Sequence, residues 1–344
     1  MKHKSSLLWF VLLLSMSSCL VSYENLSIEV LKPATFTLPE NIRKIALVSR
    51  NLKYDNDTLQ NYQVLNRKLI KDKIKFNVDS LSQLICMDSL AAKLLTHKNI
   101  DSVLVLPVNS FPIIRVQKVK LDKAEWYKYL ANETRADGLI VLDMLSSFYS
   151  RPKVINSTPY ANVITYNIWS IYDCKKQKII DHFVKVDTLY WDGIDESGVF
   201  KMHRLPEKKE AVLIAAGIAG ENYVKRILPT WNMVYRDIMT CNNPIFKKVA
   251  KFASQNKWEE ASSFWQINKE SKRKLYRIIS LYNLAVSSEM IGDIDQAIKY
   301  TDQAAQTSIG RFWSVENESV RQYSAVLYQR KNEIDKLKVQ YDHR

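Results

Sequence analysis

Residues 162–190 read NVITYNIWSIYDCKKQKIIDHFVKVDTLY, which is two alternating segments separated by a polar stretch at 173–177. In the second segment Ile180, Val184 and Val186 share one face of an extended chain, and charged residues share the other face. A period of two residues is typical of a strand with one solvated face, and a short polar connection between two such strands is typical of a hairpin. The sequence therefore predicts an antiparallel β-hairpin, around which this part of the chain folds.

Strands and helices alternate on both sides of the predicted hairpin. The other predicted strands are 42–49, 102–106, 139–148 and 231–239, and the predicted helices are 80–96, 122–135 and 207–228. The last of these helices has Ala or Gly at many positions, which would let it lie close on a sheet. This order of elements predicts an α/β sandwich, a mixed sheet with helices, over residues 42–241.

The chain becomes helical in character after a linker at 242–244. The residues that mark the change are Leu281-Tyr282-Asn283-Leu284-Ala285, Gly292-Asp293, Ala297-Ile298 and Ala304. In order and spacing they resemble the tetratricopeptide repeat, in which small residues lie where two antiparallel helices touch and a glycine takes the turn. An upstream copy around Ala261 lies 36 residues before Ala297, close to the repeat length of about 34. The resemblance implies an all-α domain of helical hairpins over 242–344, with capping helices at 319–340, and hence an α+β chain.

In tetratricopeptide proteins the first helix of each repeat lines a concave face that binds peptides. The matching positions in this chain are Phe246, Lys247, Ala250, Tyr282, Asn283, Val286 and Glu289. Asn283 matches a position that often hydrogen-bonds the backbone of a bound peptide. The resemblance therefore implies a protein-binding groove, and the alternative is that these residues pack on the neighbouring domain.

The N-terminus has the composition of an export signal. Basic residues at 2–4 precede an apolar run at 7–14, which is shorter than the roughly 20 residues needed to span a bilayer. Small residues then lead into Cys19, a pattern that resembles a bacterial lipobox with Met16 in place of the usual leucine. The resemblance implies a signal peptide at 1–18, acylation of Cys19 and a lipidated tether at 19–41; the alternative is ordinary cleavage near Ser17. Acidic residues are sparse after Cys19, so we expect an outer-membrane lipoprotein that faces the periplasm.

The composition excludes some classes of protein. The formal net charge is +14, but an export signal and the absence of any nucleic-acid-binding motif argue against nucleic acid as a partner. Besides Cys19 there are three cysteines: Cys86 is expected in the core, and Cys174 and Cys241 could pair. No CxxC motif or Cys/His cluster is present, so we expect neither a structural zinc nor another cofactor.

Candidate catalytic residues lack the partners that catalysis needs. His182 and His203 have no serine-hydrolase or zinc-protease motif beside them, so the sequence predicts no enzyme and no small-molecule substrate. Acidic residues cluster around Gly193 without the spacing of a calcium loop, which favours a solvated loop over a metal site. Asp57-Thr58-Leu59 resembles an O-glycosylation signal of Bacteroides-type envelopes, and this makes Thr58 a candidate acceptor.

The segment 136–141, followed by the hairpin, resembles the periplasmic domains of curli-secretion lipoproteins, of the TolB N-terminal region and of penicillin-binding-protein activator lipoproteins. With the lipobox and the repeats, the chain resembles an uncharacterised lipoprotein family of Bacteroides-type bacteria. We therefore expect a non-catalytic envelope lipoprotein that scaffolds or regulates a protein partner through its repeats. The alternative is an envelope polymer-binding protein or hydrolase with an unrecognised site in the α/β domain.

Overall fold

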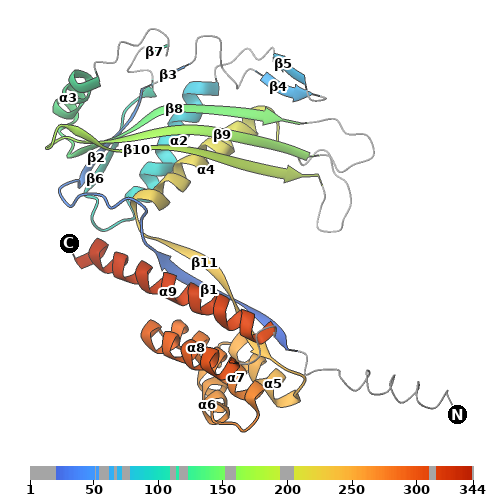
Figure 1. Cartoon of the computed structure of the whole chain (residues 1–344). Coiled ribbons are helices and arrows are strands. Elements are labelled where there is room, and N and C mark those ends of the chain that lie inside the picture. Colours follow the sequence, from blue (N-terminus) through green and yellow to red (C-terminus); the bar gives the residue numbers. More distant parts are fainter. Residues whose placement is uncertain are drawn as a thin grey trace. The chain divides into compact units, whose positions relative to one another are not determined.

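The computed structural model describes residues 21–50, 52–53, 62–65, 68–71, 78–108, 114–115, 123–151, 160–193, 205–309 and 315–342. They form two compact units. The sheet unit comprises Ala34–Thr230, and the helical unit comprises the N-terminal residues up to Pro33 together with Trp231–Asp342 (Figure 1). This α+β architecture, with a mixed sheet and a helical C-terminal part, confirms the predicted fold class. Among the described residues, no helix combines the length and the apolar composition needed to cross a membrane.

The sheet unit is built on one mixed sheet with the strand order β10-β9-β8-β2-β6. Its strands are β2 (Lys44–Ser49), β6 (Ser102–Val105), β8 (Gly138–Ser150), β9 (Tyr160–Asp173) and β10 (Lys178–Asp192). Strand β2 runs parallel to β6 and β8, and β8, β9 and β10 are antiparallel to one another. The hairpin at 162–190 is therefore confirmed as β9 and β10. Short strands add to this unit: β4 (Tyr62–Leu65) pairs with β8 and β5 (Lys68–Lys71), and β3 (Leu52–Lys53) pairs with β7 (Ile114–Arg115).

Two helices cover one face of the sheet, and a third lies on the other. Helices α2 (Val78–Leu94) and α4 (Lys208–Ile227) enclose a core with Trp169 of β9, while α3 (Lys123–Thr134) packs on Val48 of β2. The glycines of α4 were expected to face the sheet. Instead Gly217 approaches Ser89 of α2, and Gly220 lies against the backbone of Cys86. The two helices come close because one of them lacks side chains at these points.

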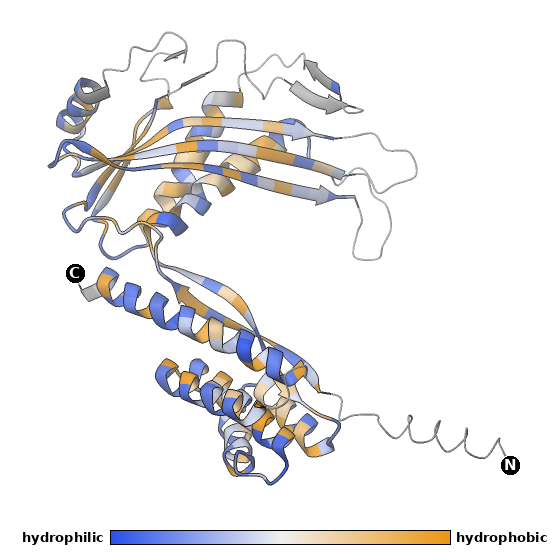
Figure 2. Ribbon diagram, in the orientation of Figure 1, coloured by the Kyte–Doolittle hydropathy of each residue, from blue (hydrophilic) through white to orange (hydrophobic). Residues whose placement is uncertain are grey.

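In the hairpin, the face of β10 that carries the valines is exposed, and the face that carries the charged residues is covered by α4. Strands β9 and β10 alternate in hydropathy along their length (Figure 2). However, Val184 and Val186 lie on the exposed face of β10, while Asp181 and Asp187 face α4, where Arg226 and Asn222 bind them. A register shift between residues 179 and 181 also turns Ile180 to the helix-covered face, so it does not share the face of the valines.

The helical unit contains the predicted helix pairs. Its helices are α5 (Pro244–Ser254), α6 (Trp258–Asn268), α7 (Lys274–Met290), α8 (Ile294–Ser308) and α9 (Val315–Asp342). Asn243 and Asp293 cap α5 and α8 by accepting backbone N–H groups, and Gly292 takes the turn before α8 with φ +84°. Ala261 and Ala297 are fully buried, as expected for residues where paired helices touch. Residues 319–340 form part of a single helix, α9.

A two-stranded ribbon completes the helical unit and corrects two predictions. Strand β1 (Ser22–Lys32) pairs with β11 (Thr230–Thr240), and the two run in opposite directions (Figure 1). Residues 22–32 are therefore a strand and not a tether. Strand β11 was expected to belong to the main sheet, but it lies in the helical unit. Buried Ile28 and Val30 of β1 pack with Trp258 of α6, which explains why this ribbon folds with the helices.

Candidate functional site

The expected groove residues lie on α5 and α7, as predicted, but they do not form an open groove. Buried are Phe246, Ala250, Tyr282, Asn283, Val286 and Glu289, and Lys247 is exposed. Residues of β11 belong to the same core cluster as these helix residues. The face that would receive a peptide is therefore covered by a strand of the same chain.

The side chain of Asn283 binds the backbone of this strand. The backbone N–H of Met239 donates to Asn283 Oδ1 at 2.8 Å, and Asn283 Nδ2 donates to the carbonyl oxygen of Met239 at 2.7 Å. Asn283 is 1% exposed, so water cannot replace either bond. The asparagine that resembles a peptide-binding position thus makes both hydrogen bonds with β11 in place of a separate peptide.

A buried ion pair fixes β11 nearly two turns further along α7. Arg236 Nε and Nη2 donate to the two carboxylate oxygens of Glu289 at 2.7 and 2.6 Å, and Tyr323 of α9 donates to Glu289 Oε2 at 2.8 Å. The side chain of Glu289 is 2% exposed and that of Arg236 is 10% exposed. Burial would lower the pKa of Arg236, but the hydrogen bonds and charge of Glu289 raise it, while burial and Glu289 raise the pKa of Tyr323 well above its usual value. This cluster joins β11, α7 and α9, and it corrects the prediction of a free binding position at Glu289.

The outer face of the ribbon is apolar and exposed. Trp231, Met233 and Tyr235 alternate along β11, and they are 67%, 62% and 66% exposed. The inner residues of the ribbon face the helices, so these three side chains share the opposite face. The alternation predicted the strand, but nothing in the local sequence indicated which face would be covered.

The sheet unit contains a row of hydrogen-bonded polar residues that the sequence did not predict. Arg50 Nη1 donates to Asp143 Oδ1 at 3.0 Å, and Ser170 Oγ donates to Asp143 Oδ2 at 2.5 Å. Ser170 Oγ also lies 3.1 Å from Nδ1 of His182, its register partner on β10. Asp143 enters the row because the register of β8 shifts between residues 142 and 144. Burial and the nearby Asp143 raise the pKa of Tyr127, which lies beside this row, to about 12.

The direction of the hydrogen bonds in this row does not fit a catalytic serine. Ser170 has one hydroxyl proton and donates it to Asp143, so it can only accept a hydrogen bond from Nδ1–H of His182. A nucleophilic serine must instead donate to the imidazole that takes its proton. Ser170 is also 2% exposed, which keeps a substrate away from its oxygen. The row therefore connects three strands and does not resemble an acyl-transfer site.

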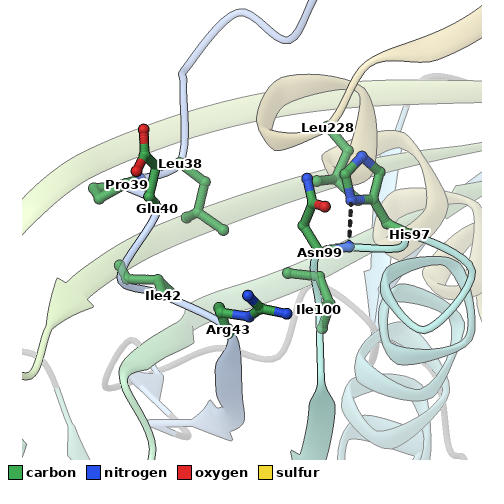
Figure 3. Close-up of a pocket in the computed structure, with 9 residues that line it drawn as sticks. All are labelled: Leu38, Pro39, Glu40, Ile42, Arg43, His97, Asn99, Ile100 and Leu228. Carbon is green, nitrogen blue, oxygen red and sulfur yellow. Dashed lines mark hydrogen bonds between the residues drawn. The ribbon is translucent and has the colours of Figure 1, made fainter. Parts of the chain in front are cut away.

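A pocket of about 420 Å³ lies where α2 and α4 end and β2 begins (Figure 3). Its apolar wall includes Ile42, Ile100 and Leu228, and Arg43 and His97 add polar groups. Arg43 Nη2 donates to Asp101 at 2.8 Å, and this bond raises the pKa of Arg43. His97 Nδ1 accepts from the backbone N–H of Asn99 at 3.4 Å. The arrangement offers a cavity with an apolar wall and a mixed polar rim, to which Glu40 contributes a carboxylate as well as Arg43 a guanidinium.

Several predicted residues have no described environment. Cys19, Thr58 and His203 lie outside the described residues, as do the acidic residues at 195 and 196. Within the described ranges, no group of three His, Cys, Asp or Glu residues could hold a metal ion. Cys86 is buried as predicted, and Cys174 and Cys241 do not form a disulfide with each other.

Two family models match the chain. One, described as a domain of unknown function (DUF8603), matches residues 42–238, more than half of the chain; another, described as a domain of unknown function (DUF6340), matches residues 247–332. No curated protein matches the chain. Among solved structures, a crystal structure of a Xanthomonas campestris protein of the DUF330 family model matches over 56% of this chain and 91% of that chain, with 9% identity and a TM-score of 0.27. A likeness this distant carries no argument about function.

Proposed function

The chain belongs to the family of the domain of unknown function DUF8603, and we propose that it is a non-catalytic lipoprotein of the cell envelope that binds a partner protein. In this proposal the tetratricopeptide-like helices serve as a scaffold that supports the β1–β11 ribbon, and the ribbon presents the binding surface. Acylated Cys19 anchors the chain to the outer membrane, with the folded units in the periplasm.

The observation that carries the proposal is the exposure of three large apolar side chains on one face of the ribbon. Trp231, Met233 and Tyr235 each expose more than three fifths of their surface. Aromatic residues and methionine are enriched at protein interfaces, and a few such residues usually supply most of the binding free energy. Isolated exposed apolar residues are common, but three in alternation on a strand form a contiguous patch.

The proposed anchor lies close to the helical unit. Cys19 precedes the first residue of β1, Ser22, by three positions, and three extended residues span at most about 11 Å. Tyr23 donates or accepts a hydrogen bond with Ser319 of α9 at 2.7 Å, which ties the start of β1 to the helices. Acyl chains on Cys19 would therefore hold the helical unit itself near the bilayer.

We expect palmitate label to be incorporated into the wild-type chain and lost from Cys19→Ala, because the thiol is the acylated group. Loss of the acyl chains should also release the variant from membranes, since each buried CH₂ contributes about 0.8 kcal/mol. Metabolic labelling followed by membrane fractionation checks this. Cys174→Ala, which changes a free thiol elsewhere, is the control and should keep the label. Label retained by Cys19→Ala would exclude this anchor.

Replacing Trp231, Met233 and Tyr235 together by serine should reduce crosslinking to the partner in the native envelope at least tenfold. A tenfold loss needs only about 1.4 kcal/mol, and a single central aromatic residue can contribute 2 kcal/mol or more. Ile267→Ser is the matched control, because Ile267 is 76% exposed near the C-terminal end of α6, nine residues after Trp258, which packs on the ribbon. Circular dichroism should show both proteins folded. Equal crosslinking by wild type and triple variant would refute the binding surface.

The pocket beside Arg43 favours a second candidate, an envelope protein that binds a polymer or a small ligand. Its apolar wall and its polar rim, with Arg43 and Glu40, suit a ligand with an apolar body and a polar end. Saturable binding that Arg43→Ala abolishes, together with unchanged crosslinking by the ribbon variant, would favour this candidate over protein binding.

A further inference from the structure

Strand β10 forms one edge of the main sheet. It pairs with β9 in continuous register from Asp181 to Asp192. In an antiparallel strand, every second residue directs its backbone N–H and C=O away from the paired neighbour. Within the described part of the chain, no strand pairs with that outer edge of β10. The edge therefore presents a row of backbone groups for another strand.

The edge also lacks most features that usually prevent strand pairing. Proteins commonly shorten edge strands, place proline in them, bend them with a bulge or give them inward-pointing charges. From residue 181 onward, β10 has only the last of these, with Asp181, Lys185 and Asp187 on its covered face. The opposite edge, β6, is short, with four residues. Strand β10 has 15 residues without proline, and its register shift lies at its beginning, between residues 179 and 181. The regular part from 181 onward remains suited to pairing.

The charges on either side of Val186 in β10 are opposite, so that the strand is complementary to an antiparallel copy of itself. Lys185 precedes this residue and Asp187 follows it, and their side chains lie 3.2 Å apart on the face toward α4. We propose that β10 pairs antiparallel with β10 of a second copy of this chain, around a two-fold axis perpendicular to the sheet at Val186. This pairing joins two sheets edge to edge.

In this register the side chains nearest the axis meet suitable partners. Lys185 lies opposite the partner's Asp187, and by symmetry Asp187 lies opposite the partner's Lys185. Opposite charges placed directly across a strand pair stabilise it, so the four side chains form one alternating network. On the exposed face Val186 meets the partner's Val186, and Val184 meets the partner's Thr188. Directly opposed residues share a face of the joined sheet.

The neighbouring symmetric registers are excluded by charge. Moving the axis by one residue toward the N-terminus places Lys185 opposite the partner's Lys185. Moving it by one residue the other way places Asp187 opposite the partner's Asp187. Like charges directly opposite each other destabilise a strand pair. The register centred on Val186 therefore places opposite charges across the strand pair, whereas each of the two neighbouring registers places like charges there.

The exposed face of the hairpin gives the pairing a further source of stability. Val184 and Val186 are 43% and 55% exposed, and on β9 Ile164 and Tyr166 are each 37% exposed. Tyr166 is the register partner of Val186 on β9. A second copy would place its own valines beside these residues and remove apolar surface from water. Backbone pairing and this apolar contact therefore act at the same place.

The register predicts which single cysteine will crosslink two copies. In Val186→Cys the two introduced cysteines face each other across the axis with Cα atoms about 4.5–5.5 Å apart, which suits a disulfide. In Val184→Cys, on the same face of the same strand, the two cysteines lie four residues out of register, about 13 Å apart along the strand. After mild oxidation of the purified full chain, we expect denaturing, non-reducing electrophoresis to show a disulfide-linked dimer for Val186→Cys and only the monomer band for Val184→Cys and wild type. Monomer in all three, or equal crosslinking by both variants, would overturn the proposal.

A charge exchange tests the same pairing without cysteine. Lys185→Asp places two aspartates opposite each other at both symmetric positions, and we expect it to raise the dimer dissociation constant at least tenfold in sedimentation experiments. Lys185→Asp/Asp187→Lys restores opposite charges across the axis and should return the constant to within about threefold of wild type. A double variant as weak as the single variant, or a single variant as tight as wild type, would contradict the register.

Discussion

Gly220→Ala is expected to lower the free energy of unfolding of the sheet unit by about 3 kcal/mol. A Cβ atom at this position would lie 2.0 Å from the carbonyl oxygen of Cys86 and 2.9 Å from its carbonyl carbon. Both atoms belong to the backbone of α2, so no rotamer change can relieve the overlap. Helix α2 or α4 must shift, and Cys86 is part of the main core between them.

Gly217→Ala is the matched control, one turn earlier on the same helix. Its Cβ would lie 3.3 Å from Ser89 Oγ and 3.5 Å from Ile85 Cγ2, which are side-chain atoms that can move. Replacing a helical glycine by alanine also favours the helix by about 1 kcal/mol. Urea unfolding followed by circular dichroism should therefore show Gly217→Ala near wild type and Gly220→Ala far below it. Equal midpoints for the two variants would mean that the close contact of α2 and α4 contributes little.

Local periodicity was sufficient to predict most elements of the sheet unit. The hairpin, the first strand and the small-residue helix were found because burial on one face leaves a regular pattern in the chain. The ribbon was missed for a different reason. Residues 25–30 alternate between polar and buried apolar side chains, but two prolines and the nearby Cys19 favoured a tether. A strand whose partner lies about 200 residues later leaves no local sign of that pairing.

The same limit applies to the candidate site. The resemblance placed Asn283 and Glu289 on the correct helix, but it implied a separate peptide as their partner. Their partners, Met239 and Arg236, come from β11 of the same chain. The polar row of Asp143, Ser170 and His182 likewise depends on strand register and on the shift in β8, which sequence spacing does not determine.

Arg236→Met is expected to destabilise the helical unit by about 3–5 kcal/mol, because it leaves a buried charge without its partner. The side chain of Glu289 is 2% exposed, and Arg236 supplies two of the three hydrogen bonds to it. Tyr323 would remain as a single neutral donor. The same loss would free β11 from α7, although Asn283 would still bind the backbone of Met239.

The double variant Arg236→Met/Glu289→Leu should recover most of that loss, because removing both charges abolishes the unpaired carboxylate. It leaves the hydroxyl of Tyr323 without its acceptor, so we expect it to remain below wild type by about 1–2 kcal/mol. Lys331→Met is the control. Lys331 pairs with Asp295 at 2.7 Å on the same unit, but both side chains are exposed. The unfolding midpoint of this variant should therefore equal that of wild type. Urea unfolding of all four proteins checks these values. If the double variant were as unstable as Arg236→Met, the loss of unfolding free energy would come from lost packing around β11. Packing of the ribbon against the helices, and not this ion pair, would then stabilise its position.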